Sequence, residues 1–230
     1  MNNNNFPLVS VLLSTFNNSQ SINDSVNSIL NQTYKNIELL IIDDASTDST
    51  WEKLVRFSDP RIKLFKNKDN IGLTKSLNRL ISNSNGQYIA RQDGDDISFP
   101  HRLEKQINIL SNSFYQVCTS RAQIKDNNSL IPGLSFYFPY KLIFKFKNPF
   151  IHGTMVIEKN CLDDLKGYDE NFYYAQDYKL FSDLIKSKVS IYQIKEPLYI
   201  LNMKNNISSD NLNKQNYFAS CVRKNILPNL

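Results

Sequence analysis

The sequence predicts a single α/β domain spanning residues 1–230, built on a mostly parallel central sheet flanked by helices. Three observations lead to this prediction. Short apolar runs alternate with amphipathic runs over the first hundred residues, as in successive strand–helix units. Turn-forming residues separate these runs at short intervals. The 230 residues, 41% of them hydrophobic, are enough to bury one large core without disulfides or a structural metal.

The first half supplies the regular part of the pattern. Buried strands are expected at residues 8–13, 37–42, 61–66 and 87–92. Helices are expected between them at 21–30, 49–57 and 74–82, the first two opened by capping boxes that start at Ser21 and Ser49. Pro100 is expected in the first turn of the next helix, where its missing N–H costs no hydrogen bond.

The second half is less regular. Strands are expected at 115–120, 150–157, 189–193 and 198–201, helices at 176–186 and 210–225, and a polar loop at 125–133. No internal repeat and no linker separates the halves. The break near residues 121–133 therefore indicates a change of role within one domain.

Composition narrows the class of protein. The three cysteines are scattered without the spacing of a zinc site, so we expect buried, reduced thiols in a reducing compartment. The polar start, Met1 to Asn5, lacks the features of a secretory signal, and no apolar run is long enough to span a membrane. We therefore expect a cytoplasmic protein. The net charge of +5 is too mild to indicate a nucleic-acid partner.

Polar clusters follow three of the expected parallel strands. Ser14, Thr15, Phe16 and Asn17 follow the first strand, Asp43 and Asp44 the second, and Asp93, Gly94, Asp95 and Asp96 the fourth. Ligands of open α/β sheets bind at the carboxyl ends of the strands. The three clusters are therefore expected to line one crevice.

The cluster Asp93 to Asp96 has the chemistry of a metal site. Its carboxylates repel one another unless a cation or hydrogen-bond donors offset their charge. Hard oxygen ligands of this kind suit Mg²⁺ or Mn²⁺ held together with substrate phosphates. The competing interpretation is a solvated acidic turn. A metal held by Asp95 and Asp93 is favoured because the cluster ends a buried strand beside two other polar clusters.

The remaining polar residues suggest a nucleotide pocket. Asp44 is a candidate acceptor for a base N–H or for ribose hydroxyls, although Asp43 or Asp44 could instead cap the following turn. Phe16 could stack on the base or belong to the core. Lys75 and Arg91 could pair with a diphosphate or with the acidic cluster, and a solvated surface position is the alternative for Lys75.

These motifs resemble the family 2 inverting glycosyltransferases of the GT-A fold, of the kind that build bacterial surface polysaccharides. The resemblance rests on VSVLLSTFN (9–17), SILNQTY (28–34), ELLIIDDASTDST (38–50), NIGLTKSLN (70–78) and GQYIARQDGDDISFPHRL (86–103), which follow in family order. It implies that Ser14, Thr15 and Asp44 hold the nucleotide and that Asp95, with Asp93 nearby, holds the metal and diphosphate. Residues 1–120 would then bind the nucleotide sugar and residues 121–230 the acceptor.

The second half resembles the family more loosely, through NPFIHGTMV (148–156) and GYDENFYYAQDYKL (167–180). These segments match the acceptor side and the catalytic base. Asp177 occupies the position of the base, whereas Gln176 stands where the family often has Glu. His152 is a lone histidine among apolar residues, for which a core or acceptor-lining role is favoured over metal ligation. The alternative for Asp177 is an acidic residue in the first turn of a helix, where its charge interacts favourably with the helix dipole.

The chemistry agrees with these roles. A sugar hydroxyl needs a general base to become a nucleophile, and a nucleoside diphosphate leaving group gathers charge that a cation neutralises. We therefore expect a hexosyltransferase that moves one sugar from a nucleotide sugar, such as a UDP-sugar, to a glycan or lipid-linked acceptor at the inner face of a membrane. A processive synthase is disfavoured because the only tryptophan, Trp51, lies in no Q-x-x-R-W motif.

Two other functions remain open. A sugar nucleotidyltransferase would share the sheet and Mg²⁺, but residues 14–18 lack its glycine-rich basic loop. A catalytically silent nucleotide-sugar-binding protein stays possible because of Gln176. Residues 136–147 interleave aromatic residues with lysines, and are expected to form one helix that either packs on the sheet or touches a lipid interface weakly.

Overall fold

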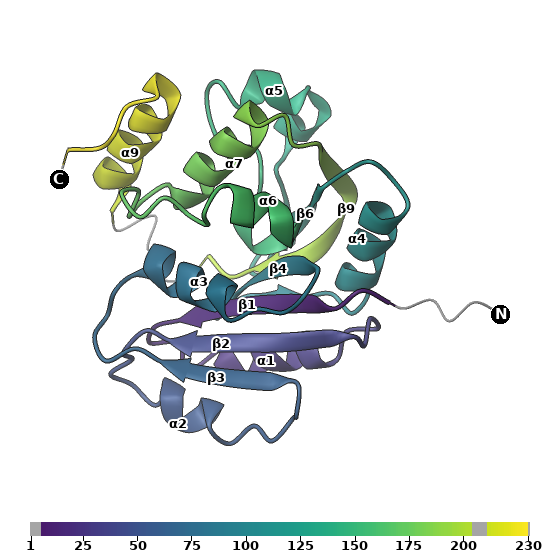
Figure 1. The fold of residues 1–230 in the computed structure, drawn as a ribbon, viewed down its shortest axis with the longest axis vertical. Helices are drawn as coiled ribbons and strands as arrows, with labels where there is room; N and C mark the ends of the chain where they lie inside the picture. Colours follow the sequence, from purple (N-terminus) through teal and green to yellow (C-terminus); the bar gives the residue numbers. More distant parts are fainter. Residues whose placement is uncertain (1–5, 204–210, 230) are drawn as a thin grey trace.

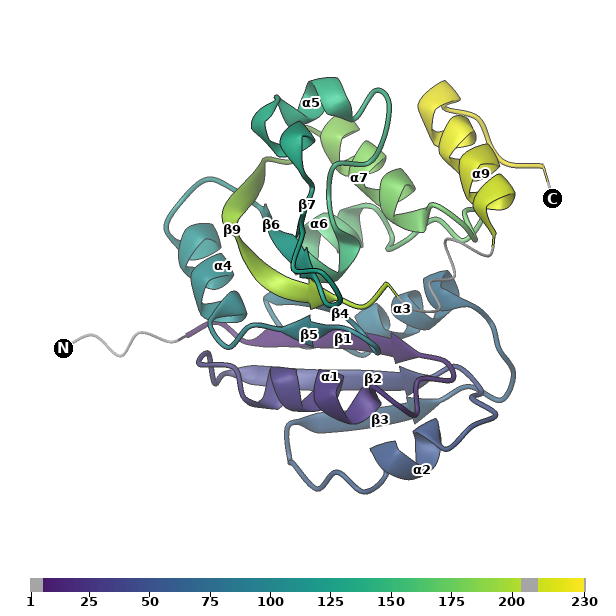
Figure 2. The ribbon, with the colours of Figure 1, turned by 180° about the vertical axis from the view of Figure 1, so that it is seen from behind.

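The computed structural model describes residues 6–203 and 211–229. One curled sheet of mixed direction runs through the molecule, in the strand order β3-β2-β1-β4-β8-β6-β9-β5, with β7 paired to β6 (Figures 1 and 2). Four of its strands come from the first half and are mutually parallel: β1 (Val9–Thr15), β2 (Ile37–Asp43), β3 (Ile62–Lys66) and β4 (Tyr88–Asp93). The four strands predicted for this half are confirmed.

Helices cover both faces of this parallel part. Every residue of β1 and β2 is buried, as expected for strands packed on both sides. One face packs against α1 (Ile22–Leu30), α2 (Thr50–Leu54) and α4 (Arg102–Ser111). The other packs against α3 (Leu73–Ser82), α6 (Lys159–Asp164) and α7 (Gln176–Lys186) (Figures 1 and 2). Two apolar layers thus hold the sheet from both sides.

The second half extends the same sheet with strands of both directions. They are β5 (Ile97–Ser98), β6 (Val117–Ile124), β7 (Leu130–Ile131), β8 (Val156–Glu158) and β9 (Ile191–Leu201). β8 runs antiparallel to both β4 and β6 and so joins the two parts of the sheet. β6 and β9 are parallel to each other.

Several expectations for the second half need correction. The strands predicted at 189–193 and 198–201 are one continuous strand, β9, because β6 pairs along most of its length. The predicted loop 125–133 contains β7, which folds back on β6 as a hairpin. Of the strand predicted at 150–157 only the end forms β8, because the 3₁₀ turn η2 (His152–Thr154) precedes it. The helix at 176–186 is confirmed as α7.

The two predicted capping boxes do not form. The Ser21 hydroxyl donates instead to the Gly94 carbonyl, 3.2 Å away, and ties α1 to the acidic cluster. At α2 the capping acceptor is Asp48, whose Oδ1 accepts from Thr50 N at 2.9 Å, and the helix ends at Leu54. Pro100 lies outside α4, ahead of its N-cap residue His101.

The segment 136–147 is not one helix. It forms the 3₁₀ turn η1 (Leu134–Tyr137) and the short helix α5 (Tyr140–Ile143), with Pro139 between them. Tyr140 and Phe144 pack inward on Phe150. The face expected to pack on the sheet comprised Phe138, Leu142, Ile143 and Phe146. Ile143 is half-buried, but Phe138, Leu142 and Phe146 are exposed, so this face does not pack on the sheet.

The last described helix is α9 (Leu212–Lys224), as predicted, although the expected start at Asp210 lies outside the described residues. The three cysteines are buried and unpaired, as the sequence predicts. Across the described ranges, no helix has the length and apolar character needed to cross a membrane.

Candidate active site

The three polar clusters meet at the carboxyl ends of the parallel strands. In the sheet register Ser14 stands between Ile42 and Asp93, and Thr15 stands beside Asp43. The backbone N–H of Asp44 donates to the Thr15 carbonyl at 2.8 Å. The residues expected to bind a nucleotide and a metal are therefore neighbours along one edge of the sheet.

The Asp44 carboxylate holds the backbone of a neighbouring loop. Its Oδ1 accepts from Asn67 Nδ2 at 2.7 Å and from Ile71 N at 3.0 Å, and its Oδ2 accepts from Gly72 N at 2.8 Å. The carboxylate thus fixes the loop that leads into α3. A carboxylate has about four acceptor positions, so three donors leave room for about one more.

The neighbouring Asp43 has the capping role that the sequence left open. It is fully buried and accepts from the backbone N–H and the hydroxyl of Ser46. Asn17 N donates to Ser46 Oγ at 2.9 Å, and Asn17 Oδ1 accepts from Thr47 N at 2.8 Å. Asp43 and Asn17 therefore shape the loops around the pocket.

Two candidate nucleotide contacts lie at the surface of this edge. The Phe16 side chain is 40% exposed, so it does not belong to the core. Lys75 is exposed on the first turn of α3. Tyr173 closes the opposite side, because a Cβ added to Gly72, whose φ is +87°, would lie 2.4 Å from the Tyr173 ring. The pKa of Tyr173 is raised by burial and by nearby charge that includes Asp44.

The acidic cluster is rich in negative charge that nothing fully offsets. Burial, followed by the charge of Asp93, raises the pKa of Asp95 to about 6. Burial and the charges of Asp93 and Asp95 raise the pKa of Asp96 to about 8. Arg91, almost fully buried, pairs with Asp93 Oδ1. The charges of the two predicted metal ligands thus interact, and Arg91 and Lys125 offset the rise in the pKa of Asp95 only in part.

A frame of buried side chains holds this cluster. The Asp93 N–H donates to the Tyr199 hydroxyl at 3.0 Å, and Asp96 Oδ1 accepts from Asn202 N at 2.7 Å. Arg102 donates to the Gly153 carbonyl at 2.6 Å, and its guanidinium lies over the Tyr199 ring. A Cβ on Gly153 would lie 2.5 Å from the Tyr199 hydroxyl oxygen and 2.8 Å from Asp93 Oδ2, so a larger residue would displace these side chains.

The donor set suits a hard divalent cation that also has ligands outside the protein. Over the residues that the structure describes, no three His, Cys, Asp or Glu side chains are grouped to hold a metal by themselves. Mg²⁺ characteristically takes one or two carboxylates and completes its shell with water and substrate phosphates. Burial, and after it the neighbouring negative charge, raises the pKa values of Asp95 and Asp96, and a bound cation would stabilise the ionised carboxylates.

The predicted base faces this cluster from the second half. Asp177 is the second residue of α7, and its Oδ2 accepts from Asn148 Nδ2 at 2.8 Å. Its pKa is raised chiefly by burial, and the charge of Asp93 also raises it. Gln176 begins α7 after Ala175, which has a left-handed backbone. Asp177 and Asp93 therefore belong to one electrostatic site.

His152 is held near the same carboxylates but does not have the surroundings of a metal ligand. Its Nε2 is 2.7 Å from the Tyr168 hydroxyl. Burial, and then the charge of Arg91, lowers its pKa well below the usual value. His152 is therefore a neutral imidazole bonded to a buried phenol, and its acceptor-lining role stays a prediction.

The chain matches the model of glycosyl transferase family 2 over residues 10–163, which include both aspartate clusters. The chain belongs to glycosyl transferase family 2. It is 38% identical to the putative glycosyltransferase EpsE of Bacillus subtilis over 85% of this chain and 73% of that protein. It is 33% identical to the UDP-Glc:alpha-D-GlcNAc-diphosphoundecaprenol beta-1,3-glucosyltransferase WfgD of Escherichia coli, over 78% of this chain and 70% of that one.

Solved structures of other proteins share the fold of this family 2 chain. S. aureus TarS 1–349 in complex with UDP superimposes with a TM-score of 0.76 at 18% identity, over 93% of this chain and 64% of that one. The Pyrobaculum calidifontis mannosyltransferase PcManGT in complex with GDP-Man and Mn²⁺ superimposes with a TM-score of 0.73, over 98% of this chain and 67% of that one. The predicted GT-A fold is thereby confirmed.

The structure of this family 2 glycosyltransferase adds site residues that the sequence prediction missed. They are Asn148 beside Asp177, Tyr168 beside His152, and Tyr199 beneath Asp93. Asn148 and Tyr168 fall within the family segments NPFIHGTMV and GYDENFYYAQDYKL, which was the available signal. Tyr199 gave no signal, since an aromatic residue in a buried strand is ordinary core.

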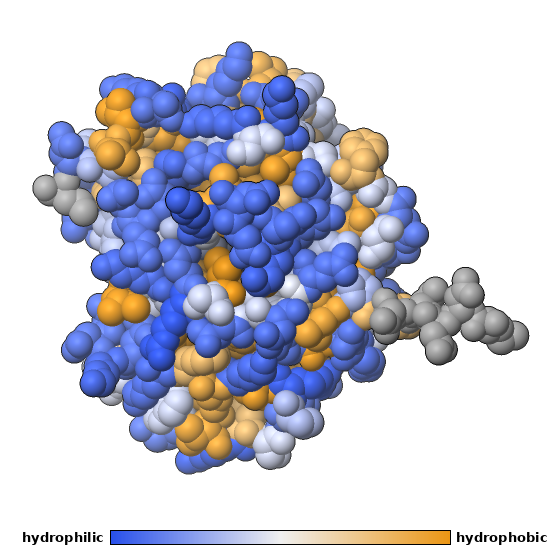
Figure 3. Space-filling view, viewed as in Figure 1, coloured by the Kyte–Doolittle hydropathy of each residue, from blue (hydrophilic) through white to orange (hydrophobic). Residues whose placement is uncertain are grey.

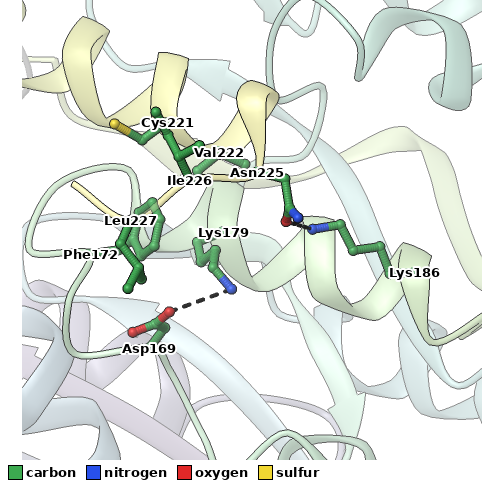
Figure 4. A pocket seen from close by; sticks show the side chains of 9 residues that line it. All are labelled: Asp169, Phe172, Lys179, Lys186, Cys221, Val222, Asn225, Ile226 and Leu227. Carbon is green, nitrogen blue, oxygen red and sulfur yellow. Dashed lines mark hydrogen bonds and ion pairs between the residues drawn. The ribbon is translucent and has the colours of Figure 1, made fainter.

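Two other acidic residues of the segment that resembles the catalytic-base region, Asp169 and Glu170, have structural partners. Asp169 pairs with Lys179 at 3.5 Å and lines a cavity of about 140 Å³ between α7 and α9 (Figure 4). Glu170 Oε1 accepts from Asn78 Nδ2 at 3.1 Å. The other side chains around the cavity are Phe172, Lys186, Cys221, Val222, Asn225, Ile226 and Leu227. None of the residues predicted for the site lines this cavity.

Proposed function

We propose that this chain transfers one sugar, with inversion, from a nucleoside diphosphate sugar of the uridine type to a hydroxyl of a glycan or lipid-linked glycan. A divalent cation, Mn²⁺ or Mg²⁺, assists. The nucleotide would lie along Ser14, Thr15, Phe16 and Asp44, with Asn17, Lys75 and Gly94 at the rim of the pocket. Asp177 would act as the base.

One observation carries the proposal: carboxylates from opposite halves of the chain influence each other across the site. Asp93 ends a parallel strand of the donor half, Asp177 begins a helix of the acceptor half, and the charge of Asp93 raises the pKa of Asp177. In a displacement with inversion the base and the leaving group act on opposite sides of the sugar carbon, and a base from the acceptor half is compatible with a metal site in the donor half.

The side chains have separate tasks in such a reaction. Asp177 accepts the proton of the acceptor hydroxyl as that oxygen attacks the anomeric carbon, and its raised pKa makes it a stronger base than an exposed Asp. Asn148 orients the carboxylate. Asp95 and Asp93 would hold the cation, which when bound offsets charge on the departing diphosphate. His152 and Gln176 would line the acceptor side.

The named relatives support the substrate class. WfgD is described as using UDP-Glc on a diphosphoundecaprenol-linked sugar, and TarS has been solved with UDP and with UDP-GlcNAc. PcManGT was solved with GDP-Man and Mn²⁺, which supports use of a cation. An acceptor carried on a lipid would bring the reaction to the inner face of a membrane.

Asp177→Asn tests the proposal because it keeps shape and removes the base. We expect donor affinity, measured by titration calorimetry with UDP-sugars and Mn²⁺, to stay within about threefold while turnover falls about 10²-fold or more. Asp169→Asn is the matched control and should keep its turnover. Wild-type turnover would give a product of inverted anomeric configuration by NMR. Tight donor binding without turnover by the wild type would favour a silent binding protein instead.

A further inference from the structure

The segment 134–147 presents an apolar surface that the fold does not cover. Five side chains point outward, with exposed fractions of 82% for Leu134, 60% for Tyr137, 56% for Phe138, 48% for Leu142 and 71% for Phe146. In Figure 3 apolar side chains reach the surface at the top of the view, where Figure 1 places α5. Clustered exposed apolar groups of this size mark interaction surfaces.

The exposure is not a result of poor anchoring. Tyr140 and Phe144 point inward, where Phe144 meets the Tyr178 ring edge-on at 4.7 Å between centroids and both residues contact Phe150. The Tyr178 hydroxyl donates to the Phe144 carbonyl. The backbone is therefore fixed, and it holds Phe138, Leu142 and Phe146 outward.

The charge within this segment is of one sign. Lys141, Lys145 and Lys147 are exposed among the apolar residues, and residues 127–157 contain no Asp or Glu. Two more cations flank the segment: Arg121 lies over the rings of Phe136 and Tyr137, and Lys195 lies 5.6 Å from the centroid of the Tyr137 ring. The complementary partner is apolar beneath and negatively charged at its surface, which describes an anionic lipid bilayer.

The same segment is connected to the proposed base. Asn148, the residue after Lys147, donates to Asp177, and Arg223 Nη1 donates to the Phe146 carbonyl at 3.4 Å. A surface resting on the segment would therefore sit beside the acceptor side of the site.

We propose that the segment 134–147 docks on an anionic lipid surface, inserting Phe138, Leu142 and Phe146 at the interface with its lysines at the headgroups. Its purpose, to bring a lipid-linked hydroxyl to Asp177, rests on the proposed function. The docking itself does not.

Co-sedimentation with vesicles tests the docking. The wild type should pellet with phosphatidylglycerol–phosphatidylcholine vesicles at low salt, and much less at high salt or with phosphatidylcholine alone. Lys141→Glu/Lys145→Glu/Lys147→Glu should lower the partition about tenfold or more. The matched control, Lys35→Glu/Lys68→Glu/Lys166→Glu, changes net charge equally at other exposed lysines and should stay within about twofold.

A second pair of variants tests the apolar contribution. Leu142→Ser/Phe146→Ser should also lose vesicle binding, whereas Val55→Ser/Phe114→Ser, exposed elsewhere, should not. Circular dichroism would verify that each variant is folded. A wild type that stays in the supernatant at low salt overturns the proposal, as does equal loss in the matched controls. The proposal is also overturned if the wild type does not bind vesicles but forms a dimer that Leu142→Ser/Phe146→Ser dissociates. Since no sugar transfer is needed, an inactive chain that still binds vesicles would reject only the proposed function.

Discussion

At the scale of single residues, Asn148 sets how readily Asp177 gives up its proton. Its amide N–H stabilises the carboxylate and so opposes the rise in pKa that burial causes. Turnover should increase with pH as Asp177 ionises. Asn148→Ala removes the donor, raises the pKa further and should move this acidic limb to higher pH. The pH dependence of kcat measures this shift, with the exposed Asn108→Ala as control. If the rise in kcat occurs at the same pH in Asn148→Ala, Asn148 does not influence the base.

Asp44 is expected to matter twice. Asp44→Ala leaves the donors of Asn67, Ile71 and Gly72 without their acceptor, so urea unfolding should show a loss of about 1–3 kcal/mol. If the fourth acceptor position binds uracil, UDP binding should weaken by a similar 1–3 kcal/mol. Asn67→Ala keeps the carboxylate and should cost stability with less effect on UDP. An unaltered dissociation constant for UDP in Asp44→Ala would remove Asp44 from the base pocket.

The acidic cluster is expected to need a cation for activity. Asp95→Ala should abolish transfer, and EDTA should silence the wild type until Mn²⁺ or Mg²⁺ is restored. Asp126→Ala, outside the cluster, serves as the control. Undiminished transfer in chelator would mean that Asp93 and Asp95 do not work through a metal.

The sequence located the acidic residues of the site but not the groups that hold them. Asp93, Asp95 and Asp177 stand out because carboxylates interrupt apolar patterns or match family segments. Tyr199 supports Asp93 from 106 residues away, and that contact exists only once β9 has joined the sheet. No local pattern encodes such a pairing.

At the scale of elements, α3 clamps the segment that leads to the base. Asn78 Nδ2 donates to the Tyr168 carbonyl at 2.9 Å, and Tyr168 N donates to Asn78 Oδ1 at 2.8 Å. Asn78→Ala breaks both bonds. We expect a stability loss of about 1–3 kcal/mol in urea unfolding and a fall in kcat larger than any change in donor affinity. Asn83→Ala, at the exposed end of α3, is the control. A variant with normal kcat would show that Asp177 does not depend on this clamp.

Elements were predictable where one physical signal dominated. α7 matches its prediction because apolar spacing and burial agree along its length. Capping was mistaken at α1 and α2, since Ser21 had a better partner in the Gly94 carbonyl and Asp48 lay closer to the free N–H groups of α2. The segment 136–147 failed as a helix because Pro139 divides it and its inward residues are Tyr140 and Phe144.

At the scale of the whole molecule, the sequence predicted the parallel part of the sheet and missed how the rest is joined to it. β1 pairs with β2 and β2 with β3, which are consecutive strands joined by helices, and β4 then returns to the free edge of β1. β8, with only three residues, runs against both of its neighbours. β8 pairs with the edge of β4 that β1 leaves unpaired, and this edge is defined only once the sheet has assembled.

The late position of β8 in the chain has a consequence during synthesis. β4 is finished at residue 93, but the strand that covers its free edge begins at residue 156. At a synthesis rate of about 5–20 residues per second, the edge waits roughly 3–13 seconds on the ribosome. An uncovered strand edge invites pairing with other nascent chains, and inward-pointing charges discourage it. Arg91, which is buried and paired with Asp93 in the finished protein, would thus also protect the unfinished one.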